Sequence, residues 1–353
     1  MMMNRVSLFA VVTTAALLRP LGSEAIAASG GPSLLSSPGT GISANKSEPG
    51  PTALAEALAS PLGLVLDHDV LYWTNHGTPP GFADGSIMKM PAAGGAPVTI
   101  AANVLNPLFL AVANGNVYWT SGGTASGTDG SVNKVSVLGG PVTKLATGQL
   151  GPLGVTADDH EVFFTSLGTL ANNYNDGSVA KVPVGGGQVT TIASAELLPY
   201  YVVADATSVY WTSPINAGIE KAPRAGGAKD LLAPSSGGPL GITLDAGTVY
   251  WTEVMSSTVQ SISTAGGAAT QLADGQSHPS GIIADRGDVF FTNAGNGTSD
   301  GSVVEVPGAG GGARVLASGY TYPFGIAVDA SYVYVAVGGA ANVSAGSIVR
   351  IAR

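Results

Sequence analysis

Residues 117–120 read Val-Tyr-Trp-Thr, and this short aromatic segment returns along the chain with small changes. The copies are Tyr72-Trp73-Thr74, Tyr118-Trp119-Thr120, Phe163-Phe164-Thr165, Tyr210-Trp211-Thr212, Tyr250-Trp251-Thr252, Phe290-Phe291-Thr292 and the degenerate Tyr334-Val335-Ala336. Their middle residues are 40 to 47 positions apart. A period in the forties is typical of the blades of a β-propeller.

Each aromatic segment lies inside a longer unit that begins at a proline. The prolines are Pro61, Pro107, Pro152, Pro199, Pro239, Pro279 and Pro323. An apolar run follows the proline (strand a, such as residues 325–329), then the aromatic strand b, a variable loop, strand c (such as residues 177–183), a glycine pair and strand d (such as residues 98–101). Because glycine pairs suit hairpin turns that need positive φ, each unit predicts one blade of four short strands.

The seventh unit ends after strand c, at Arg353, and lacks its own strand d. Residues 52–55 match residues 143–146, which form strand d of the second unit. We therefore predict that the N-terminal segment supplies the outer strand of the last blade, which pairs an edge that would otherwise be exposed. The prediction is an all-β fold: a single seven-bladed β-propeller over residues 52–353, with four antiparallel strands in each blade.

The N-terminal residues have the pattern of a secretory signal. Arg5 supplies a positive start, residues 6–18 are mostly apolar, and Ala25-Ile26-Ala27 forms an A-x-A cleavage site. We interpret residues 1–28 as a signal peptide and residues 29–51, rich in Gly, Ser and Pro, as a flexible linker. The protein is expected to be secreted or periplasmic, without membrane insertion once the signal is cleaved, because no later segment is a transmembrane candidate.

Composition excludes several function classes. The 353 residues carry 14 Lys and Arg against 23 Asp and Glu, a net charge of −9, and the basic residues are scattered. Nucleic-acid binding needs clustered basic residues, so no nucleic-acid partner is expected. The chain has no cysteine, which excludes disulfides, zinc–thiolate sites and cysteine nucleophiles. We expect a monomer.

The Val-Tyr-Trp-Thr strand, the aspartate that ends strand a and the Pro-x-Gly start resemble the YWTD and NHL repeat propellers, over residues 52 to 353. The glycine pair after Lys-Val-Pro is similar to that of uncharacterised secreted bacterial propellers. The aspartate of the YWTD signature is replaced here by Asn75, Ser121, Ser166, Ser213, Glu253, Asn293 and Val337. The resemblance implies a superfamily of protein-binding modules, sensor domains and a few metal-dependent lyases and hydrolases, so the fold does not select a function.

The four histidines show no pairing typical of a catalytic set. His68 and His160 fall in turns between strands a and b, His76 in a b–c loop and His278 in a d–a loop. Nucleophilic catalysis needs a base beside the nucleophile, so no catalytic residues are predicted. The repeat style is also similar to that of virginiamycin B lyase-like propellers, which use histidine and Mg²⁺. This resemblance implies an alternative, a metal-dependent lyase or hydrolase using His76, His278 or loop carboxylates.

Two sets of aspartates recur. One set ends strand a: Asp67, Asp158, Asp205, Asp245, Asp285 and Asp329. The other precedes strand c within Asp-Gly-Ser: Asp84, Asp129, Asp176 and Asp300. An acidic ring or calcium loops are one interpretation, but the recurrence favours turn capping, and no loop has the EF-hand spacing. No cofactor is predicted. Binding of Ca²⁺ or Mg²⁺ is left as an alternative that no motif supports.

The residue after each proline should surround the mouth of the central channel, on the face of the b–c and d–a loops. This position holds Leu62, Leu108, Leu153, Tyr200, Leu240, Ser280 and Phe324. The fourth unit departs most from the repeat, with Tyr200-Tyr201, and units 4 and 5 have short b–c loops. The predicted ligand-binding residues are Leu62, Leu108, Phe109, Tyr200, Tyr201, His278 and Phe324.

The leading hypothesis is an exported, non-catalytic binding protein for a small molecule, a peptide or a protein of the cell envelope. The second hypothesis is the metal-dependent lyase or hydrolase. The third is a structural scaffold in which the same side chains simply plug the channel.

Overall fold

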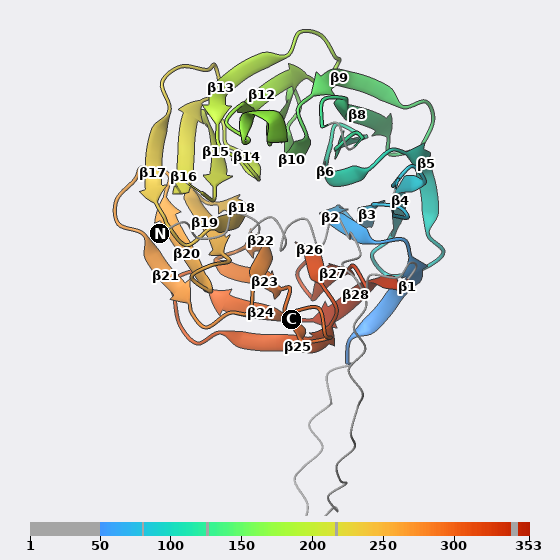
Figure 1. Ribbon diagram of the computed structural model, residues 1–353. Coiled ribbons are helices and arrows are strands. Elements are labelled where there is room, and N and C mark those ends of the chain that lie inside the picture. Colours follow the sequence, from blue (N-terminus) through green and yellow to red (C-terminus); the bar gives the residue numbers. More distant parts are fainter. Residues whose placement is uncertain (1–49, 80, 125–126, 216–217, 340–344) are drawn as a thin grey trace, which may run out of the picture.

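The computed structural model describes residues 50–353, except residues 80, 125–126, 216–217 and 340–344. These residues form a ring of seven four-stranded antiparallel sheets around a central axis (Figure 1). The prediction of an all-β, seven-bladed propeller is confirmed. The predicted signal peptide (1–28) and all but the last two residues of the predicted linker (29–51) lie outside the described residues.

The strands take the four predicted places in each blade, numbered here in chain order. The innermost strand a is β2 (Pro61–Asp67), β6 (Pro107–Ala113), β10 (Pro152–Ala157), β14 (Val202–Ala204), β18 (Pro239–Asp245), β22 (Pro279–Asp285) and β26 (Pro323–Val328). Strand b is β3 (Val70–Asn75), β7 (Asn116–Ser121), β11 (Glu161–Ser166), β15 (Ser208–Ser213), β19 (Thr248–Glu253), β23 (Asp288–Asn293) and β27 (Tyr332–Val337). Strand c is β4 (Gly85–Pro91), β8 (Gly130–Ser136), β12 (Gly177–Pro183), β16 (Gly218–Pro223), β20 (Thr258–Ser263), β24 (Gly301–Pro307) and β28 (Gly346–Ala352). The outer strand d is β5 (Val98–Val104), β9 (Thr143–Gln149), β13 (Thr190–Glu196), β17 (Asp230–Pro234), β21 (Thr270–Ala273), β25 (Arg314–Tyr320) and β1 (Thr52–Leu58).

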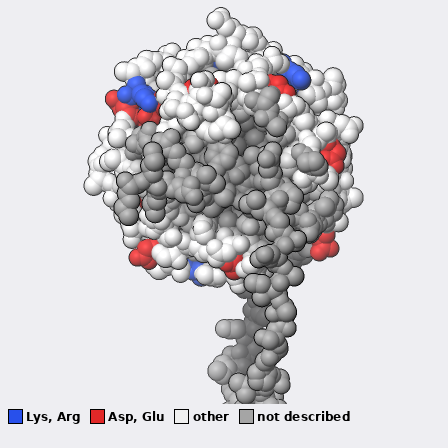
Figure 2. Space-filling model, viewed as in Figure 1, with Lys and Arg blue, Asp and Glu red and all other residues white. Residues whose placement is uncertain are grey.

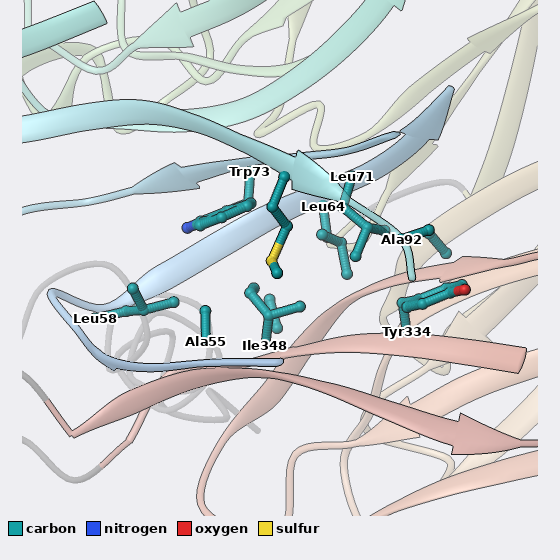
Figure 3. Close-up of a cluster of buried hydrophobic side chains, with 11 residues drawn as sticks. Ala55, Leu58, Leu64, Leu71, Trp73, Ala92, Tyr334 and Ile348 are labelled. Carbon is teal, nitrogen blue, oxygen red and sulfur yellow. The ribbon is translucent and has the colours of Figure 1, made fainter. Parts of the chain in front are cut away.

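The last blade is closed by the N-terminal strand. β1 pairs antiparallel with β28, with Ala53 opposite Val349 and Ala55 opposite Ile348. The sheet order is therefore β1-β28-β27-β26, and strands from both ends of the described chain meet in one blade. The side chains of Ala55 and Leu58 join a buried cluster with Trp73 of the first blade (Figure 3). The predicted closure is confirmed.

The aromatic residues of strand b form the core between blades. Side chains alternate across a strand, so consecutive aromatic residues point to opposite neighbouring blades. Trp73 packs in the cluster shared with the seventh blade, whereas Tyr72 packs in the cluster shared with the second. Both are buried. The aromatic repeat is thus explained by packing on both faces of each sheet.

Charged side chains are few and scattered around the rim of the face shown in Figure 2. The exposed part of the molecule in this view carries no concentration of basic residues. None of the helices among the described residues is long and apolar enough to span a membrane; the one short helix is a 3-10 turn, η1 (Leu170–Asn172).

Candidate functional site

The residues that follow the seven prolines gather at one end of the channel. Six of them pack in a single buried cluster: Leu62, Leu108, Leu153, Tyr200, Leu240 and Phe324. Tyr200 is 2% exposed and Phe324 is 5% exposed. The remaining residue, Ser280 of blade 6, is also buried, and its hydroxyl forms a hydrogen bond with the Thr292 hydroxyl. These side chains close the mouth on the side of the b–c and d–a loops.

A second layer lies one residue further along each strand a. Five blades have glycine at this place: Gly63, Gly154, Gly241, Gly281 and Gly325. A Cβ at Gly281 would collide with the carbonyl oxygen of Phe324 in the next blade, so glycine permits the close approach of the two blades. The other two blades have Phe109 and Tyr201 here, and both line the channel.

Phe109, Tyr201 and Phe324 form an aromatic layer across the channel. The rings of Phe109 and Tyr201 meet edge to face, with centroids 4.7 Å apart. The Phe109 and Phe324 rings are 5.8 Å apart, and the Tyr201 and Phe324 rings 6.5 Å apart. These are the separations of interacting aromatic pairs. All three residues also line the space within the channel.

A cavity of about 400 Å³ extends from the aromatic layer along the strands a toward the a–b turns. Its walls include Val65, Ala111, Thr156, Val203 and Ile283. Within its sheet each strand a pairs only with strand b, so its other edge faces the channel. The cavity therefore combines apolar side chains with backbone groups of strand edges, and both can contact a ligand.

The hydroxyl of Tyr201 is the polar group of the aromatic layer. Its Oη is buried and has no hydrogen-bond partner among the described residues. Burial raises the pKa of Tyr201 well above its ordinary value, and the adjacent Tyr200 adds to the effect. The hydroxyl therefore keeps its proton and can donate to an acceptor. A buried hydroxyl without a partner costs free energy.

Blade 4 departs from the repeat because of Pro214. In the other blades, the residue after strand b donates its N–H to the residue before the blade's proline, as His76 does to the Ser60 carbonyl and Val254 to the Gly238 carbonyl. Pro214 occupies the donor's place in blade 4 and has no N–H. Strand a of this blade is shortened to Val202–Ala204. Tyr200 and Tyr201 therefore lie before this strand, where the Tyr200 N–H donates to the Thr212 carbonyl at 3.0 Å and the Tyr201 carbonyl accepts the Thr212 N–H at 3.1 Å.

The histidines do not come together with the aromatic layer. His76 is buried, stacks on Phe82 at 4.1 Å and bonds Asn106. Burial lowers the pKa of His76 to about 4, and the bond to Asn106 opposes this only in part. His278 lies in the d–a loop with φ of 54°, outside the apolar cluster that holds the other predicted ligand-binding residues. Its Nδ1 is buried without a partner among the described residues.

The aspartates of the b–c loops brace those loops. The Asp84 carboxylate accepts the N–H and the hydroxyl of Thr78 at 2.7 Å each. Asp176 does the same for Thr169 and also accepts from Asn172. The turn interpretation accounts for these contacts. Among the described residues, no group of three or more His, Asp or Glu side chains is arranged to hold a metal ion.

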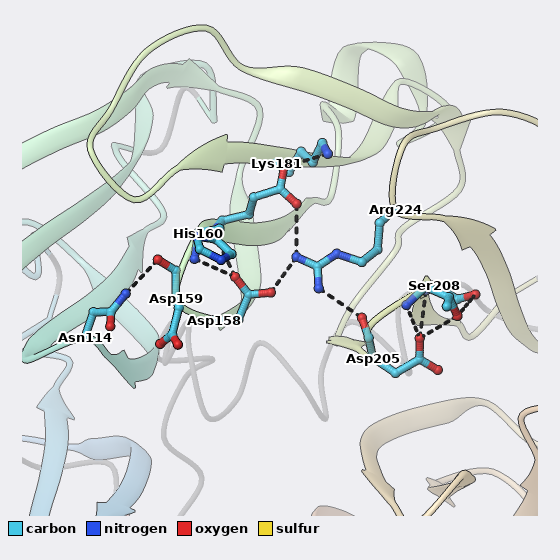
Figure 4. A network of polar contacts seen from close by, with 10 residues as sticks. Asn114, Asp158, Asp159, His160, Lys181, Asp205, Ser208 and Arg224 are labelled. Carbon is cyan, nitrogen blue, oxygen red and sulfur yellow. Dashed lines mark hydrogen bonds and ion pairs between the residues drawn. The ribbon is translucent and has the colours of Figure 1, made fainter.

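Several aspartates at the end of strand a cap turns. The Asp158 carboxylate accepts the N–H groups of His160 and Glu161 at 2.8 and 2.9 Å. Asp205 and Asp329 cap the equivalent turns of blades 4 and 7. Arg224 links blades 3 and 4 by contacting Asp158, Glu161 and the Asp205 carbonyl (Figure 4). At these three turns the carboxylates are engaged in structure.

Six of the seven predicted ligand-binding residues lie in the apolar cluster at the end of the channel. The sequence did not show their arrangement in layers. The prolines marked Leu62 and its equivalents, and the broken repeat marked Tyr200 and Tyr201. The sequence does show that five units have glycine in the Pro-x-Gly pattern and that two units have Phe109 and Tyr201 in its place. The meaning of this difference, a channel narrowed by two rings, depends on seven strands meeting around one axis.

The ring of seven four-stranded blades around one channel defines a seven-bladed β-propeller. Its fold is similar to that of virginiamycin B lyase from Staphylococcus aureus, with a TM-score of 0.66 and 15% identity over 86% of this chain and 98% of that chain. A catalytically inactive histidine-to-alanine variant of that lyase, with quinupristin, gives 0.65 and 16% over the same shares. The computationally designed protein Ika8 gives 0.59 and 11%, over 85% of this chain and 98% of that chain. These likenesses show a shared fold. No protein-family model matches the chain, and no curated protein matches it in sequence.

Proposed function

We propose that this protein is an exported, non-catalytic binding protein that takes a small, mostly apolar molecule or a peptide side chain into its central channel. One observation carries the proposal. The cavity ends at an aromatic layer whose only polar side-chain group, the Tyr201 hydroxyl, is buried without a partner among the described residues. Apolar walls with a few placed polar groups are typical of small-molecule sites.

The proposal keeps Phe109, Tyr201 and Phe324 from the predicted set and places the ligand on the channel side of their rings. Leu62, Leu108 and Tyr200 would support these rings from behind, because they are packed into the closed mouth. An aromatic layer held from behind is rigid, and a rigid site loses little entropy when it binds. The ligand's apolar body would lie along Val65 and Ala111, with an acceptor toward Tyr201 Oη.

The test compares Tyr201→Phe with Tyr200→Phe, which differ only in which hydroxyl is removed. The probes are a library of small aromatic and aliphatic carbonyl compounds. Saturation-transfer NMR identifies the compounds that bind, and calorimetry measures their affinities. Loss of the Tyr201 hydroxyl should raise the melting temperature, because a buried unpaired group costs ~1 kcal/mol or more. It should also weaken carbonyl binders about 2- to 10-fold, the value of one hydrogen bond.

Tyr200→Phe should leave these affinities unchanged. Ala111→Phe, which fills part of the cavity, should abolish binding of the same compounds. Compounds that bind equally well to the original protein, Tyr201→Phe and Ala111→Phe would overturn the proposed site. A library without any binder would favour the structural scaffold.

A metal-dependent lyase or hydrolase is the second candidate function. Its supporting observation is the shared fold with virginiamycin B lyase over nearly all of that enzyme. A ligand that binds only the folded state stabilises it by mass action. If a metal is bound, EDTA should lower the melting temperature and added Mg²⁺ should restore it, and quinupristin should be turned over only with the metal. An unchanged melting temperature and no turnover would speak against this candidate.

Export is proposed from the sequence of residues 1–28. N-terminal sequencing of the mature protein should show a start just after Ala27. A mature chain that still carries residues 1–27 in a cell-associated fraction would contradict cleavage.

A further inference from the structure

The outer parts of two neighbouring blade junctions can be compared position by position, because the repeat places equivalent residues in both. Between blades 3 and 4, one site is formed by Glu196, Ser213, Glu220 and Lys229. The same four places between blades 4 and 5, each 40 residues later, are Ser236, Glu253, Gln260 and Ala269. Each junction therefore has a carboxylate beside the tryptophan of strand b, but only the first has a lysine.

At the first junction, the lysine ammonium fills the site. Lys229 Nζ lies 2.7 Å from Glu196 Oε1 and 2.8 Å from Glu220 Oε1. Glu220 Oε2 also accepts the Trp211 indole N–H at 3.0 Å and the Ser213 hydroxyl at 2.8 Å. Both carboxylates are buried and are held beside a cation, the arrangement that makes a buried charge tolerable.

At the second junction, a cavity of about 400 Å³ is present and Ala269 lines it in place of a lysine. Glu253 lies in its wall and is only 6% exposed. Its Oε1 accepts the Ser235 hydroxyl at 2.5 Å and the Trp251 indole N–H at 3.0 Å. Its Oε2 accepts the hydroxyls of Ser256 at 2.6 Å and Thr258 at 2.9 Å.

Glu253 is held as a carboxylate without a cation. Burial alone would raise its pKa, but the four donors favour the charged form and lower the pKa below its ordinary value. Among the described residues, no Lys, Arg or His forms an ion pair with Glu253, although the matching site has Lys229. Buried charges in proteins are generally paired with an opposite charge, and here the place of that charge is open.

The polar atoms around Glu253 are arranged as acceptors. Ser235 and Ser256 donate their hydroxyl protons to the carboxylate. Ser235 Oγ also accepts the Gly237 N–H at 3.0 Å, and Ser256 Oγ lies 2.8 Å from Thr258 Oγ1. Each oxygen therefore keeps at least one lone pair for a ligand. Gln260 donates its Nε2 to Thr258, so its Oε1 is the acceptor end of the amide. An ammonium has three donors and no acceptor, and it matches such a set. Pro234, Met255 and Ala269 supply apolar walls for a carbon chain.

We propose that the cavity between blades 4 and 5 binds a primary ammonium group carried on an apolar chain. The group would come from a free alkylamine or from a lysine side chain of a peptide. The site shares no lining residue with the central channel, so it is a second binding site beyond the proposed function.

The experiment measures the affinity of n-pentylammonium by calorimetry, with 1-pentanol as the uncharged control. The unchanged protein should bind the ammonium at least tenfold more tightly than the alcohol. Glu253→Gln keeps the side-chain size and removes the charge, and it should erase this preference. Ala269→Lys restores the lysine of the neighbouring junction, and it should occupy the cavity, abolish ammonium binding and raise the melting temperature.

Nα-acetyl-lysine methylamide distinguishes the two sources of the ammonium. Binding of this compound together with pentylammonium supports a peptide side chain, and binding of pentylammonium alone supports a free amine. Lys229→Ala is the matched control, because it empties the first junction. Pentylammonium should then restore the melting temperature that this substitution lowers.

Three results would overturn the proposal: equal affinity of the original protein for pentylammonium and pentanol, unchanged ammonium binding in both Glu253→Gln and Ala269→Lys, or no rescue of Lys229→Ala. If Glu253→Gln fails to fold, Ala269→Lys and the pentanol control still decide the question.

Discussion

At the scale of single residues, the threonine of the aromatic repeat links neighbouring blades. Thr252 Oγ1 accepts the N–H of Gly241 in its own blade at 3.0 Å and donates to the Ser280 carbonyl of the next blade at 2.9 Å. The same pair of bonds recurs in the first six blades. The seventh blade has Ala336 here, which has no hydroxyl. Six junctions around the ring therefore carry this bond from strand b to strand a.

Thr252→Val tests the link, because valine has nearly the same shape and no hydroxyl. The substitution leaves a buried N–H and a buried carbonyl without their partner, which should lower the free energy of unfolding by about 1–3 kcal/mol. Chemical denaturation measures the change. Thr252→Ser keeps the hydroxyl and should lose clearly less. Equal losses for serine and valine would show that the methyl group, rather than the hydroxyl, matters at this position.

The sequence predicted the burial of the aromatic residues of strand b. It did not predict the hydrogen bonds that the threonine of this strand makes to the next blade. Trp73 and Tyr72 were predictable because large apolar side chains at a fixed period must be buried. Thr252 recurs just as regularly, but its partner lies 28 residues away, in another blade. The cavity beside Glu253 was hidden for a similar reason: it depends on the small side chain of Ala269, a strand away.

At the scale of strands, several lysines of strand c connect consecutive blades. Lys89 Nζ donates to the Val137 carbonyl at 2.6 Å, and Lys134 Nζ to the Val184 carbonyl at 2.6 Å. Lys221 makes the equivalent bond to the Thr264 carbonyl at 2.9 Å. Lys181 instead pairs with Glu161 at 2.6 Å, at the junction that Arg224 crosses. The lysines of strand c thus have a structural role at these blade junctions.

The junction between β13 and β16 should make stability depend on pH. Burial and the neighbouring Glu220 carboxylate raise the pKa of Glu196 from 4.5 to about 7, although Lys229 opposes the shift. A raised pKa in the folded state means that the stability from Glu196 is full below pH 4.5 and is lost as the pH rises through about 7. Glu220, with its pKa lowered, and Lys229, with its pKa raised, titrate outside this window.

His76 acts in the opposite direction in the same pH range. Its pKa is lowered to about 4, so its contribution to stability is present above its ordinary value of 6.5 and is lost as the pH falls toward 4. Because the two groups oppose each other, we predict a difference between two proteins rather than the slope of melting temperature against pH for one of them. As the pH rises from about 5 to about 7, the melting temperature of Glu196→Gln should rise more, or fall less, than that of the original protein. Parallel curves for the two proteins would contradict the shifted pKa of Glu196.

Strand-level prediction was accurate where the repeat is regular and incomplete where it breaks. The prolines, glycine pairs and aromatic segments predicted the order of strands in every blade. In blade 4, the effect of Pro214 was missed, because the sequence does not show which N–H group is needed. The missing donor becomes apparent only beside the bonds that His76 and Val254 make in their blades.

At the scale of the whole molecule, the ring depends on the contact between strands from its two ends. Six blades are each built from one continuous stretch of chain, whereas the seventh takes β1 from the N-terminal side. Without β1, the outer edge of β28 would lose its backbone partner and become available to other chains. The buried cluster at this junction would also lose Ala55 and Leu58, which pack with Trp73 and Ile348.

The last prediction compares two shortened chains that differ only by this strand. Removal of residues 1–49 should leave the melting temperature unchanged, because β1 is kept. Removal of residues 1–60 should lower it by several degrees, since burial of Leu58 alone is worth about 1.5–3 kcal/mol, and light scattering should show self-association through β28. A synthetic peptide of residues 50–60, added to the shorter chain, should restore the melting temperature and reduce the self-association, because it supplies the missing edge partner. If the shorter chain melts at the same temperature as the longer one and scatters light equally, the ring is held by its blade-to-blade contacts alone and β1 only covers its edge.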